Sequence, residues 1–114
     1  MPKTTTDARL IYSASDIDSN MLWATRFFAP DPFLFIQRGR RRILVMSDLE
    51  MDRARAQARV DEVRSWSAYA KAEEGAGRTA TPAGVIARVL RAIGVLRVEV
   101  PRSFPLGLAM DLDE

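Results

Sequence analysis

The segment from Phe33 to Ala58 constrains the fold most, because two apolar runs, a turn and a helix start follow one another there. The runs Phe33–Ile36 and Ile43–Met46 predict two strands of a hairpin, and Gly39 lies in the polar stretch between them, where a tight turn requires positive φ. Neither run alternates apolar with polar residues. We therefore expect both strands to be covered on two faces, as in a sheet that carries helices on each side.

A helix is predicted directly after this hairpin. Ser47 and Glu50 have the spacing of a capping box, in which each side chain accepts a hydrogen bond from the other residue's backbone N–H. Glu50 is also three residues before Arg53, a favourable helical pairing. The residues expected to face inward are Leu49, Ala56 and Val60, and those expected to face solvent are Arg53, Arg55 and Arg59.

The chain before the hairpin predicts a strand and a helix. Ala8–Ser13 is apolar enough for a strand, and Ser15 is a candidate helix cap with Asp18 in the first turn. Pro30 and Pro32 predict that this helix ends near Phe27 or Phe28. Its expected apolar face consists of Ile17, Met21, Ala24 and Phe28, widened by Leu22.

The chain after the capped helix continues the alternation. An edge strand is predicted over Val60–Trp66 and a charged linker over Ala70–Arg78. A helix follows from Thr81 and Pro82 to Gly94, then a strand over Val95–Val100 and a last helix within Phe104–Met110. The order β-α-β-β-α-β-α-β-α predicts one α/β domain over residues 1–114, with a mixed β-sheet and helices on its faces, after a disordered lead-in at residues 1–7.

The sequence contains no histidine and no cysteine. This excludes Ser-His-Asp and Cys-His catalysis, disulfides, and zinc sites built from nitrogen or sulfur ligands. An enzyme made from this chain would have to use carboxylates, Arg, Lys or Tyr. The lack of cysteine and of a long apolar segment favours a cytoplasmic protein with no membrane partner.

The hairpin turn contains an arginine cluster, a candidate anion site formed by Arg38, Arg40, Arg41 and Arg42. The net charge is only +2, and no aromatic residues interleave with the arginines to stack on bases. A solvated turn is therefore the favoured interpretation, and binding of phosphate or nucleic acid is the lesser alternative.

Three groups of carboxylates are considered as metal ligands, and none has the spacing of a calcium loop. They are assigned to a helix cap, the linker and the chain end. The groups are Asp16 with Asp18, Glu73 with Glu74, and Asp111 with Asp113 and Glu114.

The loop after the first helix is the best candidate site. Trp23 points away from the expected apolar face of that helix, and Arg26, Phe27 and Asp31 follow it. An exposed Trp beside an Arg is typical of an interface anchor, so we expect contact with a partner rather than catalysis. Partial burial of Trp23 against a neighbouring loop is the alternative.

Four runs, in their order and spacing, resemble the amino-terminal domain of the creatinase, prolidase and aminopeptidase P family. They are Leu22–Phe27, Pro32–Ile36, Leu44–Glu50 and Phe104–Ala109. The resemblance implies the fold of that domain, with its ribonuclease H-like motif. It also implies that the two divalent metal ions of the family (Mn, Co or Zn) belong to a carboxy-terminal catalytic domain absent from this chain, so no catalytic residue, metal ligand or cofactor is expected here.

The same resemblance implies a homodimer and contact with the chain's own carboxy-terminal catalytic domain. The loop with Trp23, Arg26, Phe27 and Asp31 would reach towards a neighbouring active site and restrict the entry of peptides. We therefore expect a non-catalytic amino-terminal domain of an Xaa-Pro dipeptidase or aminopeptidase, truncated or occurring as a separate piece. A free-standing α/β interaction module is the alternative. The resemblance leaves open whether the substrate of the parent protein is a peptide or a creatine-like molecule.

Overall fold

The computed structural model describes residues 8–15, 18–95 and 97–100, which form nine elements. The elements are β1 (Ala8–Ser13), α1 (Ser19–Thr25), β2 (Phe33–Arg38), β3 (Arg41–Met46), α2 (Asp48–Gln57), β4 (Glu62–Ser65), α3 (Trp66–Gly75), α4 (Pro82–Ile93) and β5 (Val98–Glu99). The lead-in at residues 1–7 and the helix predicted within Phe104–Met110 lie outside the described residues.

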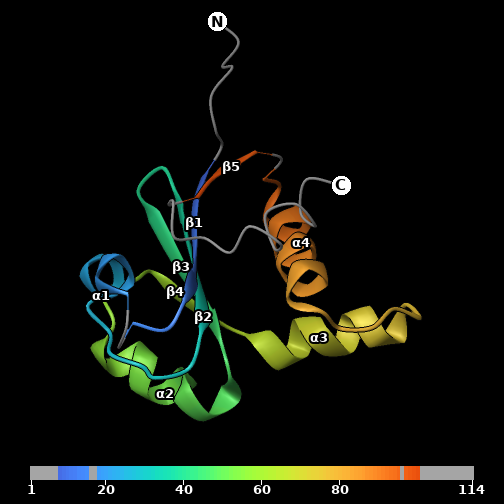
Figure 1. Cartoon of the computed structure of the whole chain (residues 1–114), viewed down its shortest axis with the longest axis horizontal. Helices are drawn as coiled ribbons and strands as arrows, with labels where there is room; N and C mark the ends of the chain where they lie inside the picture. The colour runs from blue at the N-terminus through green and yellow to red at the C-terminus, as the bar shows by residue number, and fades with distance from the viewer. Residues whose placement is uncertain (1–7, 16–17, 96, 101–114) are drawn as a thin grey trace, which may run out of the picture.

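The strands form one mixed sheet in the order β4-β3-β2-β1-β5. The inner pairs β1–β2 and β2–β3 are antiparallel, whereas β3–β4 and β1–β5 are parallel. Helices α1 and α2 lie on one side of the sheet, and α3 and α4 lie on the other (Figure 1). The predicted fold class, the hairpin at Gly39 (φ 61°) and the edge position of β4 are confirmed.

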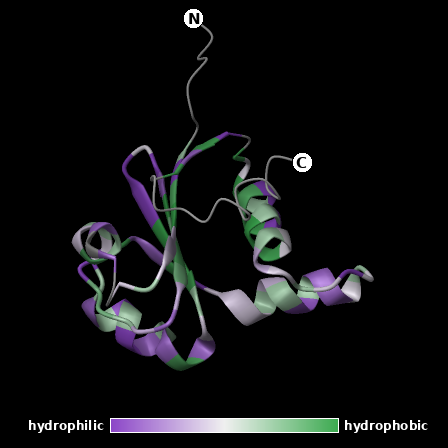
Figure 2. Ribbon diagram, viewed as in Figure 1, coloured by the Kyte–Doolittle hydropathy of each residue, from purple (hydrophilic) through white to green (hydrophobic). Residues whose placement is uncertain are grey.

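Each face of the sheet has its own apolar core. Leu10, Ile36 and Val45 pack towards α4, where they meet Ile86 and Val89. On the opposite face the buried residues are Phe33, Phe35, Leu44 and Met46 from the strands, with Met21 and Ala54 from α1 and α2. Figure 2 shows the consequence, since the middle of the sheet is hydrophobic and the tip of the β2–β3 hairpin is hydrophilic.

Helix α4 forms as its sequence predicts. The Thr81 hydroxyl accepts a hydrogen bond from the Gly84 N–H at 3.1 Å, and Gly94 ends the helix at φ 77°. Val85, Ile86 and Val89 are fully buried. Burial of each such side chain stabilises the fold by about 1.5–3 kcal/mol relative to exposure, which makes α4 the main cover of its face.

The two helices on the other face differ from their predictions. The carboxylate of Asp18, not Ser15, caps α1, while the Ser15 hydroxyl accepts from the buried Ala29 N–H at 2.6 Å. The Ser47 side chain makes no capping hydrogen bond, since the Glu50 N–H donates to the Ser47 carbonyl at 3.1 Å, and the Glu50 carboxylate pairs with Arg53 at 2.7 Å. Helix α2 also turns a different face inward: the buried residue is Ala54, and the exposed ones include Leu49 and Ala56.

The predicted linker over Ala70–Arg78 is wrong as far as Gly75, because α3 runs from Trp66 to Gly75. Glu73 is enclosed there by the guanidinium groups of Arg78 at 2.9 Å and Arg88 at 2.8 Å. These partners cover the carboxylate close to the protein surface, and Arg78 first and then Arg88 lower the pKa of Glu73 to about 2. The ion pairs therefore join α3 to α4 and the turn between them.

Candidate functional site

The end of α1 determines which side chains of the following loop face solvent. The buried Thr25 hydroxyl donates to the Met21 carbonyl at 2.8 Å and accepts from the Phe27 N–H at 3.1 Å. Between them, Arg26 adopts a left-handed conformation (φ 55°, ψ 30°) and its N–H donates to the Leu22 carbonyl at 2.8 Å. This conformation ends α1 at Thr25, two residues before Phe27, near which the prolines predict the end of the helix.

Because the helix ends at Thr25, the burial of Phe27 and Phe28 is the reverse of the prediction. Phe27, predicted to lie in the loop that reaches a partner, is 1% exposed and packs edge-on against Phe33 with the ring centroids 6.0 Å apart. Phe28, predicted to face inward, is 58% exposed. The prediction for Phe28 is wrong, because the helical spacing on which it rests does not continue past Thr25. Phe27, which the family resemblance placed in the contact loop, is buried and cannot contact a partner directly.

Arg53 of α2 holds this loop in place. Its guanidinium lies 4.3 Å from the Phe27 ring centroid and donates to the Phe28 carbonyl at 3.0 Å. Glu50 accepts from the same guanidinium at 2.7 Å and so fixes its position. Arg53 thus connects the loop to α2 through one side chain and one backbone carbonyl. These contacts fix the position of the exposed residues of the loop.

Trp23 is the largest exposed apolar side chain in the part of the chain that the structure describes. Its exposed fraction is 70%, and the guanidinium of Arg26 lies 3.9 Å from its ring centroid, as predicted for this pair. Leu22, Trp23, Arg26 and Phe28 are all exposed, and together they are called the Trp23 surface. Asp31 is exposed further along the loop, and within the described residues no ion pair joins it to Arg26.

The structure does not bring the four arginines of the hairpin together. Arg38 donates to the Ile93 carbonyl at the end of α4, where a cation is favourable, and Arg41 pairs with Glu62. Arg42 is next to Arg41 on β3, so its side chain lies on the opposite face of the sheet, the face of Leu44. Arg40 and Arg42 line a hollow together with Arg59. Arg59 is distant from the turn in sequence, and the parallel pairing of β3 with β4 brings it close. Sequence spacing alone therefore could not predict this grouping.

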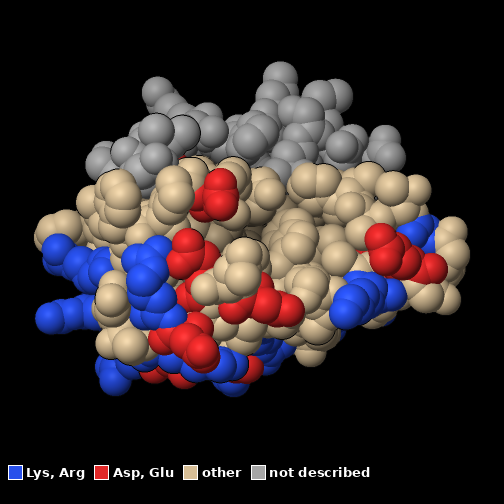
Figure 3. All heavy atoms as spheres, turned by 90° about the horizontal axis from the view of Figure 1, so that it is seen from below, with Lys and Arg blue, Asp and Glu red and all other residues tan. Residues whose placement is uncertain are grey.

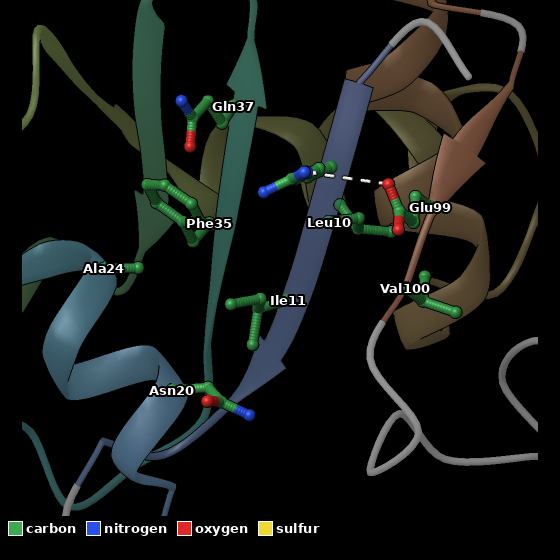
Figure 4. Close-up of a pocket in the computed structure, with 9 residues that line it drawn as sticks. Leu10, Ile11, Asn20, Ala24, Phe35, Gln37, Glu99 and Val100 are labelled. Carbon is green, nitrogen blue, oxygen red and sulfur yellow. Dashed lines mark ion pairs between the residues drawn. The ribbon is translucent and has the colours of Figure 1, made fainter. Parts of the chain in front are cut away.

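A second hollow, of about 310 Å³, lies between α1 and strands β1, β2 and β5 (Figure 4). Ile11 and Phe35 form its apolar floor, and the amides of Asn20 and Gln37 face it. The charged groups among its lining residues, Arg9 and Glu99, pair with each other at 3.5 Å. The hollow therefore offers apolar contact and amide hydrogen bonds rather than acid–base chemistry.

The carboxylate of Asp48 lies where the parallel strands β3 and β4 end, an edge at which α/β sheets commonly bind ligands. Its oxygens accept from the hydroxyls of Ser65 at 2.5 Å and Ser67 at 2.9 Å, and these bonds lower the pKa of Asp48. The Ser65 hydroxyl in turn caps α3 through the Ala68 N–H. The cluster therefore joins α2 to α3, and both oxygens of the Asp48 carboxylate already accept hydrogen bonds from serine hydroxyls.

Residues 8–15, 18–95 and 97–100 lack both a metal-binding cluster and a membrane-spanning helix. No group of three or more carboxylates lies close enough to hold a metal ion. No helix in these ranges has the length and apolar character needed to cross a membrane.

Two solved structures have the same fold. X-Pro aminopeptidase from Thermotoga maritima MSB8 superposes with a TM-score of 0.66 at 12% sequence identity, covering 95% of this chain and 28% of the other. Prolidase from Pyrococcus horikoshii OT3 superposes with a TM-score of 0.60 at 16% identity, covering 95% of this chain and 25% of the other. This chain therefore spans about a quarter of the length of either protein.

The likeness establishes the fold, a mixed five-stranded sheet with helices on both faces as in the amino-terminal domains of prolidase and aminopeptidase P. No protein-family model and no curated protein matches the chain in sequence.

Proposed function

We propose that this chain is the amino-terminal, non-catalytic domain of an Xaa-Pro peptidase. The observation that carries the proposal is the unequal coverage, since 95% of this chain matches only 25–28% of an X-Pro aminopeptidase and a prolidase. The chemistry of the chain supports it. With no histidine and no cysteine in the sequence, the usual nucleophile-base pairs and nitrogen or sulfur metal ligands are absent. The two divalent metal ions implied by the family resemblance would be held by a carboxy-terminal domain.

The role of such a domain would be contact between subunits and control of substrate entry, through the Trp23 surface. Its anchoring supports this role, because Arg53, Phe27 and Thr25 hold the loop below the exposed side chains. A preorganised surface loses less conformational entropy on binding than a mobile loop does. Trp and Arg are also the residues that most often supply binding energy at protein interfaces.

A free-standing interaction module is the second candidate, and the Trp23 surface favours it equally. The two candidates differ in what the gene encodes after Glu114. A peptidase subunit requires the spaced Asp, Asp, His, Glu and Glu ligands of a dinuclear metal domain in the same reading frame or in an adjacent gene. If neither contains them, the peptidase proposal is wrong and the module remains.

A direct assay tests the non-catalytic assignment. The assay measures release of proline from an Xaa-Pro dipeptide. The 114-residue chain with added Mn²⁺ or Co²⁺ is expected to release none. Where a metal-binding domain is encoded, that domain with this chain attached is expected to cleave the same dipeptide. Turnover by the 114-residue chain itself would contradict the assignment.

A further inference from the structure

Three arginines line a hollow of about 320 Å³ that the proposed function does not use. Arg40 comes from the hairpin turn, Arg42 from β3 and Arg59 from the segment before β4, and Val60 and Asp61 complete the lining. Figure 3, seen from below, shows Lys and Arg side chains gathered, together with Asp and Glu side chains, at the end of the molecule where α1 and α2 lie.

These three guanidinium groups differ from the other arginines of the hairpin. Arg38 and Arg41 are occupied by the Ile93 carbonyl and Glu62. Within the described residues, the side chains of Arg40, Arg42 and Arg59 form no hydrogen bond or ion pair. Neighbouring like charges repel one another, so an anion that joined them would lower the electrostatic energy of the site.

The backbone holds two of the arginines in position. The Arg42 N–H donates to the Asp61 carboxylate at 2.7 Å, and the Asp61 N–H donates back to the Arg42 carbonyl at 2.9 Å. The Arg59 N–H donates to the Thr25 carbonyl at 2.8 Å. Arg42 and Arg59 are therefore fixed to each other through adjacent residues, and little backbone ordering is needed when a ligand enters.

We infer that this hollow binds the phosphate group of a small molecule. A guanidinium offers a planar fork of donors that matches the oxygens of an oxyanion. Three forks suit a tetrahedral phosphate, which carries up to two charges and at least three free oxygens. A carboxylate has one charge and two oxygens, and would leave one arginine without a partner. The Asp61 carboxylate opposes an anion, but it is oriented towards the Arg42 backbone N–H.

The test is a titration of the 114-residue chain with inorganic phosphate, followed by the amide ¹H–¹⁵N signals of Arg42 and Asp61. Ionic strength is held constant with sodium chloride, so that general screening does not change. The variant Arg42→Gln is expected to bind phosphate at least about tenfold more weakly, since charge-assisted hydrogen bonds are lost. Asp61→Asn keeps an oxygen for the Arg42 N–H and is expected to tighten binding.

The matched control is Arg91→Gln. Arg91 is exposed on α4, across the sheet from the hollow, and lies 3.9 Å from Glu73. It removes one positive charge and is expected to change the phosphate affinity less than about twofold, as expected for a distant charge that salt screens. Equal weakening in both variants would show that net charge, not this hollow, attracts the anion, and would overturn the inference.

Two further arms separate the sources of the phosphate. A phosphate monoester is expected to bind at least as tightly as inorganic phosphate and to shift the same signals. Binding of a short single-stranded DNA without any response to phosphate or to the monoester would indicate attraction of a polyanion and would also overturn the inference. The folding of each variant is checked by its melting temperature, and Arg40→Gln, an exposed turn residue, supplies a second variant that leaves the sheet intact.

Discussion

Replacement of Phe27 and Phe28 by alanine, one at a time, tests the way in which the loop leaves α1. The two residues are adjacent and chemically identical, so each serves as the control for the other. In the structure Phe27 is 1% exposed and packs against Phe33, whereas Phe28 is 58% exposed. The sequence pattern alone predicts that Phe28 faces inward.

The expected magnitudes differ several-fold. Removal of a buried phenylalanine ring costs about 3–5 kcal/mol, because the transfer free energy is lost and a cavity remains. Phe27→Ala also removes the edge-to-face contact with Phe33 and the ring over which Arg53 lies. Phe28→Ala is expected to change the free energy of unfolding by no more than about 0.5 kcal/mol, as is usual for an exposed position. For a domain of about 100 residues, 1 kcal/mol corresponds to roughly 4–8 °C in melting temperature.

The measurement is urea unfolding of both variants and the parent chain, followed by circular dichroism and fitted by linear extrapolation. A total stability of about 5–15 kcal/mol is typical, so a loss of about 3–5 kcal/mol in Phe27→Ala is between roughly a fifth and all of it. If Phe28→Ala costs as much as Phe27→Ala, the left-handed turn at Arg26 is wrong, and so is the exposed surface built on it.

Two other changes test the α3–α4 junction and the hairpin. Glu73→Gln is expected to lower the melting temperature at neutral pH, because Arg78 and Arg88 lose their anion. The folded-state pKa of Glu73, about 2, lies below the ordinary value of 4.5, so its stabilisation is complete above pH 4.5 and is lost as the pH falls towards 2. Urea unfolding between pH 6 and pH 2 should therefore show a smaller decline in stability for Glu73→Gln than for the parent chain, and equal declines would contradict this assignment. Gly39→Val is expected to cost about 1–2 kcal/mol at φ 61°, although its side chain would meet open space, and Gly39→Asn should cost less. Equal costs in thermal unfolding would argue against a left-handed turn.

The strands and α4 are predictable from sequence because their signals are local. The apolar runs of β2 and β3, Gly39 between them, and the Thr81 and Gly94 ends of α4 each determine their own backbone. Helix α3 was predictable in part, since Ala, Lys and Glu favour helix, but the glycines at 75 and 77 suggested a linker. Neither its packing nor the burial of Glu73 could be predicted, because both depend on Arg88 of α4, 15 residues away.

The candidate site divides in the same way. The exposure of Trp23 and its proximity to Arg26 follow from helical spacing within α1. The exchange of Phe27 and Phe28 does not, because it depends on a left-handed Arg26 that Thr25 stabilises through hydrogen bonds to both of its sides. The grouping of Arg59 with Arg42 requires the pairing of β3 with the segment before β4.

Self-association of the chain is the most direct test of the proposed contact role of the Trp23 surface. Sedimentation velocity over a range of concentrations is expected to show a monomer–dimer equilibrium for the parent chain. Trp23→Ala should weaken that equilibrium at least about 30-fold, the effect of losing a binding hot spot of about 2 kcal/mol, with an unchanged melting temperature. Leu49→Ala is the control, since Leu49 is 96% exposed at the start of α2 and lies outside the Trp23 surface. A parent chain that remains monomeric, or equal weakening by Trp23→Ala and Leu49→Ala, would contradict the account.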